Sequence, residues 1–225
     1  MQRLIRILVL FLILGLGALW GAAAFNRQPG EPLGDAFMRQ VAGLMGQEAA
    51  VPSVGGVQLP EGMVLGGPFR LTDQEGRSVT QAELGGALMV GYFGFTYCPD
   101  VCPTELGAIA SALDLLPAAQ AERVTPVLFS VDPERDTPEQ LKAYVTNFHP
   151  RMVGLTGTPE QVAEVARRFR VFYAKVKRPE MTEYLVDHSS FIYLIGKDGR
   201  VRMLLRPQST PEDIAKAVQA QLATL

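Results

Sequence analysis

Two cysteines in one short stretch are the residues with the clearest chemical potential. Cys98 and Cys102 are the only cysteines among the 225 residues, and three residues separate them. Two thiols brought together by one turn can bind a soft metal ion, or they can form and break a disulfide bond. A purely structural disulfide is the weaker interpretation, because closing so short a loop restricts the unfolded chain little.

The elements around the pair predict a strand-to-helix turn. The apolar run over residues 87–95 precedes it and indicates a strand buried on both faces. Pro103 follows directly and is favoured in the first turn of a helix, which we expect over residues 103–116. Cys102 is therefore expected near the positive end of a helix dipole, where the pKa of a thiol is lowered and the metal-binding thiolate is favoured.

The two histidines have different sequence contexts. His149 lies at the end of a predicted helix over residues 138–147 and is interpreted as a helix-end residue. His188 precedes a predicted strand over residues 191–195, in the loop that faces the cysteine turn in thioredoxin-like folds. Redox members of such folds usually carry a cis-proline there, but this chain has no proline between Pro179 and Pro207.

Cys98, Cys102 and His188 therefore form the candidate metal-binding set. Soft thiolates select Cu(I), and imidazole also suits Cu(II). Zinc accepts the same donors, but a structural zinc site normally has a fourth protein ligand. Asp187 is predicted to orient the imidazole as a hydrogen-bond acceptor, with a turn residue as the alternative interpretation.

The rest of the chain predicts an α/β fold, specifically a thioredoxin-like three-layer sandwich with an added N-terminal β-hairpin. Three Thr-Pro-Glu sequences, beginning at Thr137, Thr158 and Thr210, are typical of helix starts. Gln140 and Gln161 stand where they would complete capping boxes. The expected elements are a hairpin over 69–79, strands over 87–95, 124–131, 191–195 and 201–205, and helices over 103–116, 138–147, 159–169 and from 211 onward.

The N-terminal region differs in composition. Arg3 and Arg6 precede an uncharged apolar run over residues 7–25, long enough for a membrane-spanning helix with its basic end in the cytoplasm. A cleaved signal peptide is the alternative, because residues 22–24 offer a small-residue cleavage site. In either case the remaining chain is exported. We expect an anchor over 1–25, a tether over 26–62 with a short helix near 35–47, and a folded domain over 63–225. The net charge of −2 gives no reason to expect a nucleic-acid partner.

Four segments resemble the SCO/SenC family: residues 91–105 (GYFGFTYCPDVCPTE), 130–138 (SVDPERDTP), 155–159 (LTGTP) and 186–189 (VDHS). The resemblance covers about residues 66–205. It implies a membrane-anchored copper metallochaperone, not an enzyme, that helps to assemble the binuclear copper site of cytochrome c oxidase. It places the copper ligands at Cys98, Cys102 and His188, and it makes the copper-site subunit of the oxidase the partner. The implied location is the inner (cytoplasmic) membrane, single-pass, with the C-terminal domain in the periplasm or an equivalent exported compartment.

Two other functions use the same cysteines. A thiol–disulfide oxidoreductase would employ Cys98 and Cys102 as a redox pair and reduce cysteines of the oxidase subunit or of another exported partner. This role is compatible with copper delivery, although the three-residue spacer counts against a general oxidoreductase. A peroxidase is disfavoured, because Pro99 stands where peroxiredoxins carry a peroxide-binding threonine.

Overall fold

The computed structural model describes residues 15, 17, 20–22, 24–25, 33–34, 37, 56–57, 59–60, 62–177 and 182–225. The chain divides into two units, Met1–Ser53 and Val54–Leu225. In the first unit, the rings of Trp20 and Phe37 stack with their centroids 4.9 Å apart. The predicted anchor and the helix expected near 35–47 fall mostly outside the described residues. In the part of the chain that is described, no helix combines the length and the apolar character that crossing a membrane requires.

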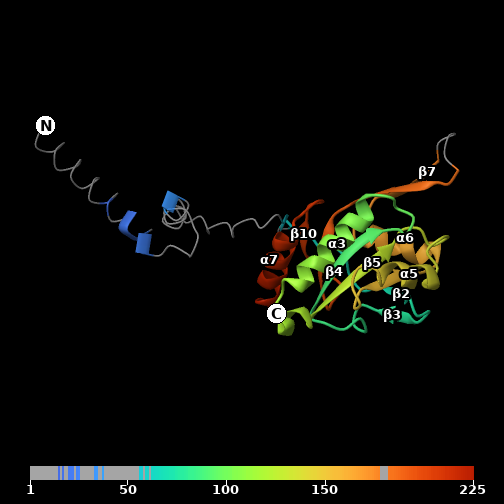
Figure 1. Cartoon of the computed structure of the whole chain (residues 1–225), viewed down its shortest axis with the longest axis horizontal. Helices are drawn as coiled ribbons and strands as arrows, with labels where there is room; N and C mark the ends of the chain where they lie inside the picture. The colour runs from blue at the N-terminus through green and yellow to red at the C-terminus, as the bar shows by residue number, and fades with distance from the viewer. Residues whose placement is uncertain are drawn as a thin grey trace, which may run out of the picture. The chain divides into compact units, whose positions relative to one another are not determined.

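An eight-stranded mixed sheet forms the centre of the second unit (Figure 1). Its strand order is β1-β10-β9-β4-β5-β6-β2-β3, with β4, β5 and β6 parallel to one another and all other pairs antiparallel. A separate two-stranded antiparallel sheet contains β7 and β8. The strands are β1 (Gly56–Val57), β2 (Arg70–Asp73), β3 (Ser78–Thr80), β4 (Leu88–Gly94), β5 (Val124–Ser130), β6 (Val153–Thr156), β7 (Tyr173–Val176), β8 (Leu185–His188), β9 (Ile192–Gly196) and β10 (Val201–Leu205).

Helices cover both faces of the main sheet. Tyr92, Leu128 and Gly154 are in register on one face, where α3 packs against β4 and β5 and α5 packs against β6. Helix α7 packs against α3 on the same side. Phe93 points to the opposite face, where its ring meets Phe169 at the end of α6. The helices are α3 (Val101–Asp114), α4 (Ala118–Ala121), α5 (Pro138–Val145), α6 (Pro159–Arg168) and α7 (Pro211–Leu222).

The two central strands are apolar because they are enclosed by these layers. Every residue of β4 and of β5 is buried. On the α6 side an aromatic cluster fills the layer, with the Phe93 and Phe129 rings stacked 4.7 Å apart. Its members are Phe69, Phe93, Phe129, Phe169 and Tyr193. Such a core leaves the carboxyl end of β4 as a fixed support for the residues that follow it.

The threonine caps confirm the predicted helix starts. Thr137, Thr158 and Thr210 each accept a hydrogen bond from the backbone N–H three residues later, and a proline opens each helix. The reciprocal bond of a capping box is present at Thr158 with Gln161. At Thr137 the threonine hydroxyl accepts from the Gln140 N–H, and the reciprocal bond from the Thr137 N–H to the Gln140 side chain is not formed.

The predicted hairpin is confirmed as β2 and β3, and the predicted α/β thioredoxin-like arrangement is present. Other details differ from the prediction. Strand β1 pairs with β10, so residues assigned to a tether belong to the sheet, and the folded unit begins before residue 63. Strands β6, β7 and β8 were not predicted, and His188 is the last residue of β8 rather than part of a loop.

Candidate metal centre

The two cysteines lie on either side of the start of α3. Cys98 follows β4 in the connecting turn and is half-buried, whereas Cys102 is the second residue of α3 and is fully buried. The Cys98 N–H donates to the Phe95 carbonyl at 3.2 Å, and the Cys102 N–H donates to the Cys98 sulfur at 3.4 Å. The helix begins at Val101, two residues earlier than predicted, and Pro103 still falls in the first turn, where its missing N–H removes no helical bond.

His188 completes a three-residue cluster. Its Nε2 lies 3.3 Å from the Cys102 sulfur, and the candidate ligand atoms of Cys98, Cys102 and His188 all lie within 4.8 Å of one another. The structure therefore brings together the three residues that the sequence singled out. His149 is not part of this cluster: it lies beyond the end of α5, where its Nδ1 accepts from the Arg151 N–H at 3.1 Å.

The partner that orients the imidazole is a backbone group. His188 Nδ1 lies 3.1 Å from the Ser189 carbonyl, which can only accept, so Nδ1 carries the proton and the lone pair of Nε2 faces the sulfurs. The prediction that Asp187 performs this role is not what the structure shows. Asp187 precedes His188 in β8, where neighbouring side chains point to opposite faces, and its own side chain is exposed.

Two aromatic rings hold the imidazole from the core side. Tyr92 and Phe95 each meet the His188 ring edge-on at a centroid distance of 5.9 Å. Gly94 lies between them in sequence, and a Cβ there would come within 2.8 Å of the Cys102 sulfur and 3.0 Å of the Tyr92 ring. The site is thus packed closely enough that residue 94 has no room for a side chain.

The thiols have opposite acidities. The hydrogen bond from the Cys102 thiol, supported by backbone amides at the start of the helix, lowers the pKa of Cys98 to about 4. Donation of that hydrogen bond, together with burial, raises the pKa of Cys102 above the usual range of a thiol. The expectation that the helix start favours the Cys102 thiolate is therefore wrong, because the first-turn N–H of Cys102 points at the Cys98 sulfur.

A pocket of about 320 Å³ opens beside the cluster on the Cys98 side. Pro99 and Val101 line it from the cysteine turn, and Leu185 and Asp187 line it from β8. Cys98 and His188 also contribute to its wall, whereas Cys102 lies behind them. A ligand from outside can therefore approach the cluster past Cys98.

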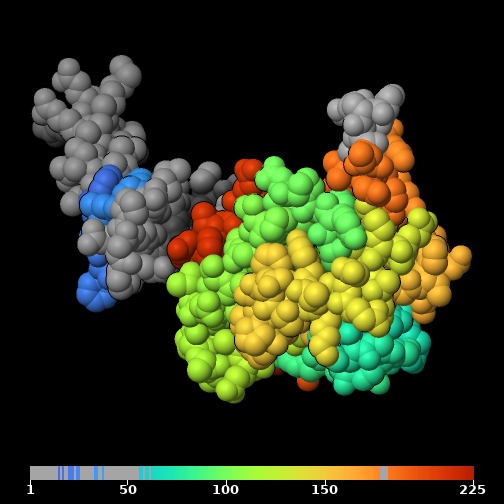
Figure 2. Space-filling model, turned by 45° about the vertical axis from the view of Figure 1, so that its right-hand side comes forward, coloured from blue at the N-terminus to red at the C-terminus, as the bar shows by residue number. Residues whose placement is uncertain are grey.

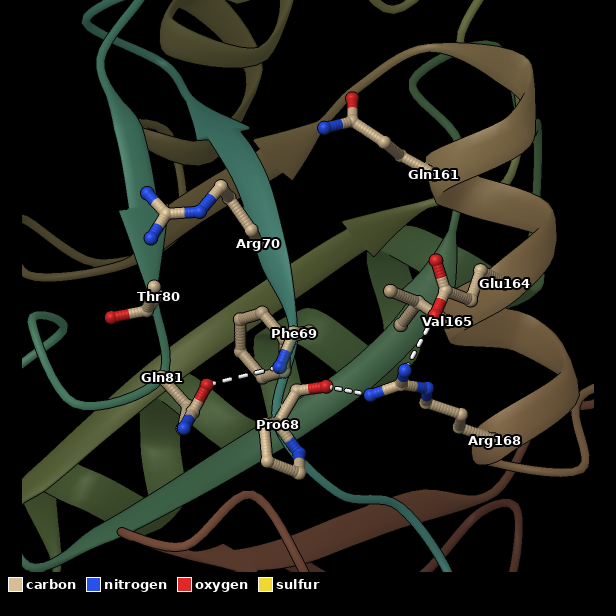
Figure 3. A pocket seen from close by; sticks show the side chains of 9 residues that line it. All are labelled: Pro68, Phe69, Arg70, Thr80, Gln81, Gln161, Glu164, Val165 and Arg168. Carbon is tan, nitrogen blue, oxygen red and sulfur yellow. Dashed lines mark hydrogen bonds and ion pairs between the residues drawn. The ribbon is translucent and has the colours of Figure 1, made fainter.

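A second pocket, of about 440 Å³, lies between the β2–β3 hairpin and α6 (Figure 3). The guanidinium of Arg168 reaches it, but this group already donates to the Pro68 carbonyl and pairs with Glu164. Gln81 accepts from the Phe69 N–H at 3.0 Å across the same space. The side chains that line this pocket therefore serve mainly to join the hairpin to the helix.

The sequence analysis gave no role to a group of polar residues next to the metal cluster. Arg135 Nε donates to Asp132 Oδ2 at 2.6 Å, and the Tyr184 hydroxyl donates to Asp132 Oδ1 at 2.7 Å. Asp136 is fully buried and accepts from the hydroxyls of Ser130 and Thr96, each at 2.6 Å. Burial raises the pKa of the Asp136 carboxyl. The available signal was the sequence SVDPERDTP, in which charged residues directly follow a buried strand.

The fold and the cluster together define a thioredoxin-like protein with two thiols and one imidazole arranged as a soft-metal site. The SCO1/SenC family model matches residues 57–223, and the chain belongs to this family. An SCO2-like protein of Rickettsia prowazekii is 47% identical over 137 residues, which cover 60% of this chain and 66% of that protein. In the first three curated relatives the matched part covers 66%, 40% and 59% of the relative's length.

Solved structures agree with this assignment. A crystal structure of Arabidopsis thaliana ScoI with copper bound is 40% identical, with a TM-score of 0.67, and the match covers 72% of this chain and 99% of that one. BsSco, described as a member of the Sco family of cytochrome c oxidase assembly proteins with a disulfide switch, is 30% identical, with a TM-score of 0.56. That match covers 75% of this chain and 99% of BsSco.

Proposed function

We propose that this protein carries one copper ion on Cys98, Cys102 and His188 and delivers it to the copper-site subunit of cytochrome c oxidase. The observation that carries the proposal is the convergence of two sulfurs and one imidazole nitrogen within 4.8 Å, with no carboxylate in the set. This donor set suits Cu(I), and the imidazole also suits Cu(II). The copper-bound Arabidopsis relative supports the choice of metal.

The two cysteines suit different parts in such a transfer. Cys98 is already a thiolate in the copper-free protein, while Cys102 holds a proton that copper must displace, so loading releases one proton. Three protein donors leave room for another ligand. A thiolate of the partner would approach through the pocket beside Cys98, bind copper, and replace the Cys98 sulfur while Cys102 still holds the ion.

We further propose that residues 1–25 anchor the chain in the inner membrane and that the domain functions on the exported side. The support is the sequence: an uncharged run over residues 7–25 that follows Arg3 and Arg6. An exported domain can meet the copper-site subunit at the membrane surface. Protease protection in sealed spheroplasts tests this, because an exported domain is digested without lysis and a cytoplasmic one is not.

Reduction of a partner disulfide is the second candidate function. The observation that favours it is the closeness of the two sulfurs, which lie within 4.8 Å of each other, together with the opposite shifts of their pKa values. The Cys98 thiolate would attack one sulfur of the partner disulfide and release the other as a thiolate, which takes up the proton of Cys102. The Cys102 thiolate would then attack the Cys98 sulfur of the mixed disulfide and release the partner's remaining sulfur. Two electrons pass to the partner, and a Cys98–Cys102 disulfide remains. The disulfide switch described for BsSco supports this chemistry.

An anaerobic Cu(I) titration of the reduced full-length protein in detergent, against a competing chelator, separates the two functions. We expect one equivalent to bind tightly and His188→Ala to weaken binding. The matched control is His149→Ala, which removes the other histidine and should leave the affinity unchanged. Equal affinities for both variants would remove His188 from the site. Failure of the unmodified protein to bind, with ready cycling of its thiols, would favour the reductase.

A further inference from the structure

The two halves of the metal centre are carried by different sheets. Cys98 and Cys102 follow β4 of the main sheet, whereas His188 ends β8 of the separate two-stranded sheet. Figure 2 shows the orange β7–β8 segment standing out from the body of the unit, beside the residues that precede α5. Tyr92 of β4 and Phe95 pack against the His188 ring, but the strand that carries His188 is not paired with the main sheet, so contacts elsewhere must also hold that strand in place.

The loop between β5 and α5, residues 131–137, contacts both halves. On the cysteine side, Asp136 accepts from the Thr96 hydroxyl at 2.6 Å and from the Thr96 N–H at 3.2 Å, two residues before Cys98. On the histidine side, Asp132 accepts from the Tyr184 hydroxyl at 2.7 Å, directly before β8. An ion pair of 2.5 Å between Glu134 and Lys175 adds a contact to β7.

Arg135 occupies the centre of this loop and touches both sides with one group. Its guanidinium carbon lies 3.6 Å from the centroid of the Tyr184 ring and 4.7 Å from that of Tyr97, the residue before Cys98. The same group donates through Nη1 to the Tyr184 carbonyl at 2.9 Å. The Phe95 ring lies next to it, 5.8 Å from the guanidinium carbon, and also meets the His188 ring.

We propose that Arg135 is a positioning residue for the metal centre. By lying between Tyr97 and Tyr184 while it pairs with Asp132, it fixes the distance between the cysteine turn and the strand that carries His188. This inference rests on the proposed copper site. Because β8 is paired with β7 along its whole length, a displacement at Tyr184 moves the strand and with it His188.

The geometry requires arginine rather than any cation. Arg135 has only 14% of its side chain exposed, and the Asp132 side chain is fully buried. A planar guanidinium can lie flat on two rings while its N–H groups reach a carboxylate and a carbonyl. A lysine has one compact ammonium and cannot make these contacts at once. Arg135→Lys therefore keeps the positive charge but removes the simultaneous contacts with Tyr97 and Tyr184.

The test compares Arg135→Lys with Arg77→Lys, measuring Cu(I) affinity by chelator competition in the full-length protein. Arg77 is a matched control, because it also pairs with a buried aspartate, Asp73, at 2.7 Å, but in the β2–β3 hairpin. Substituting a residue that orients metal ligands typically lowers metal affinity about 10- to 100-fold. We expect a loss in this range for Arg135→Lys and none for Arg77→Lys.

A double-mutant cycle with His188→Ala shows whether Arg135 acts through the histidine. We expect Arg135→Lys to have little further effect once His188 is absent. Native affinity in Arg135→Lys, or the same loss with and without His188, would overturn the proposal. If Arg135→Lys does not fold, Tyr184→Phe removes only the hydroxyl bond to Asp132 and should give a smaller loss in the same direction; an unchanged affinity there would count against the proposal.

A measurement without copper separates this inference from the proposed function. In the reduced apoprotein, Arg135→Lys should speed amide hydrogen exchange in Leu185–His188, because the β7–β8 sheet loses its contacts with the loop over residues 131–137. Exchange of the buried amides of β4 should remain unchanged. Unchanged exchange in β8 would refute the positioning role, even if copper binds. Failure of the unmodified protein to bind copper would instead refute the proposed function, and the exchange result would still stand.

Discussion

Gly94→Ala tests how closely the metal centre is packed. The added Cβ would lie 2.8 Å from the Cys102 sulfur and 3.0 Å from a carbon of the Tyr92 ring, both closer than ordinary van der Waals contact. Neither neighbour can easily move, because Tyr92 and Cys102 are fully buried. Overpacking of this kind costs about 1–3 kcal/mol. For a unit of this size, each kcal/mol lowers Tm by about 2–4 °C.

The same substitution should also weaken copper binding. The Cys102 sulfur is only 3.3 Å from His188 Nε2, so a shift that relieves the clash changes the spacing of the ligand atoms. Thermal denaturation of the apoprotein and chelator competition for Cu(I) measure the two effects.

Gly107→Ala is the control, since it lies in the same helix as Cys102 and its Cβ would meet nothing within 4 Å. It should stabilise the helix by about 0.5–1 kcal/mol and leave copper affinity unchanged. A Gly94→Ala protein with native Tm and native affinity would show that the site is not closely packed.

Two further predictions concern buried or acidic groups. Glu105 is fully buried and accepts from the Gln208 N–H at 2.7 Å, so Glu105→Ala should lower the free energy of unfolding by about 1–3 kcal/mol. Glu105→Gln keeps a hydrogen-bond acceptor and removes a buried carboxyl group whose pKa is raised by burial. Urea denaturation at pH 7 should therefore show a smaller loss of unfolding free energy for Glu105→Gln than for Glu105→Ala. Equal losses in the two variants would contradict this account. In the reduced, copper-free protein, iodoacetamide should alkylate Cys98 and spare Cys102 from pH 8 down to about pH 5, and preferential labelling of Cys102 would reverse the assignment. The pKa of Cys98 is lower in the folded protein than in the unfolded chain, so the Cys98 thiolate stabilises the folded state. This stabilisation is fully present above the unfolded-state pKa of about 8.5, and it is lost as the pH falls through the folded-state pKa of about 4.

Elements enclosed on both faces could be predicted closely from sequence. The apolar run over residues 87–95 matches β4 within one residue at each end, and the strand expected over residues 201–205 is β10 as observed. Strands β7 and β8 gave no such signal. Most of their residues are half-exposed because they form a two-stranded sheet outside the main one, so neither a continuous apolar run nor a clear alternation results.

In the candidate site, too, features set by neighbouring residues in the sequence could be predicted, whereas contacts between distant segments could not. Cys98 and Cys102 were identifiable from spacing alone, and His188 from its place before a predicted strand. The contacts of Arg135 with Tyr184 join residues 49 positions apart, and nothing in the local pattern of either residue indicates them. The acidity of the thiols was also beyond prediction, because it depends on which thiol donates a hydrogen bond to the other and on how deeply each is buried.

The difference in exposure between the two cysteines bears on whether copper is cargo or a permanent cofactor. A permanent site would be expected to enclose all its ligands, as a structural zinc site does. Here Cys102 is fully buried against the core, whereas Cys98 and His188 line an open pocket and His188 belongs to a strand outside the main sheet. An incoming thiolate can therefore replace the two half-buried ligands one at a time while Cys102 keeps hold of the ion. This arrangement favours transfer, and Arg135, through its contacts with Tyr97 and Tyr184, keeps the two halves of the site at the spacing that binding requires.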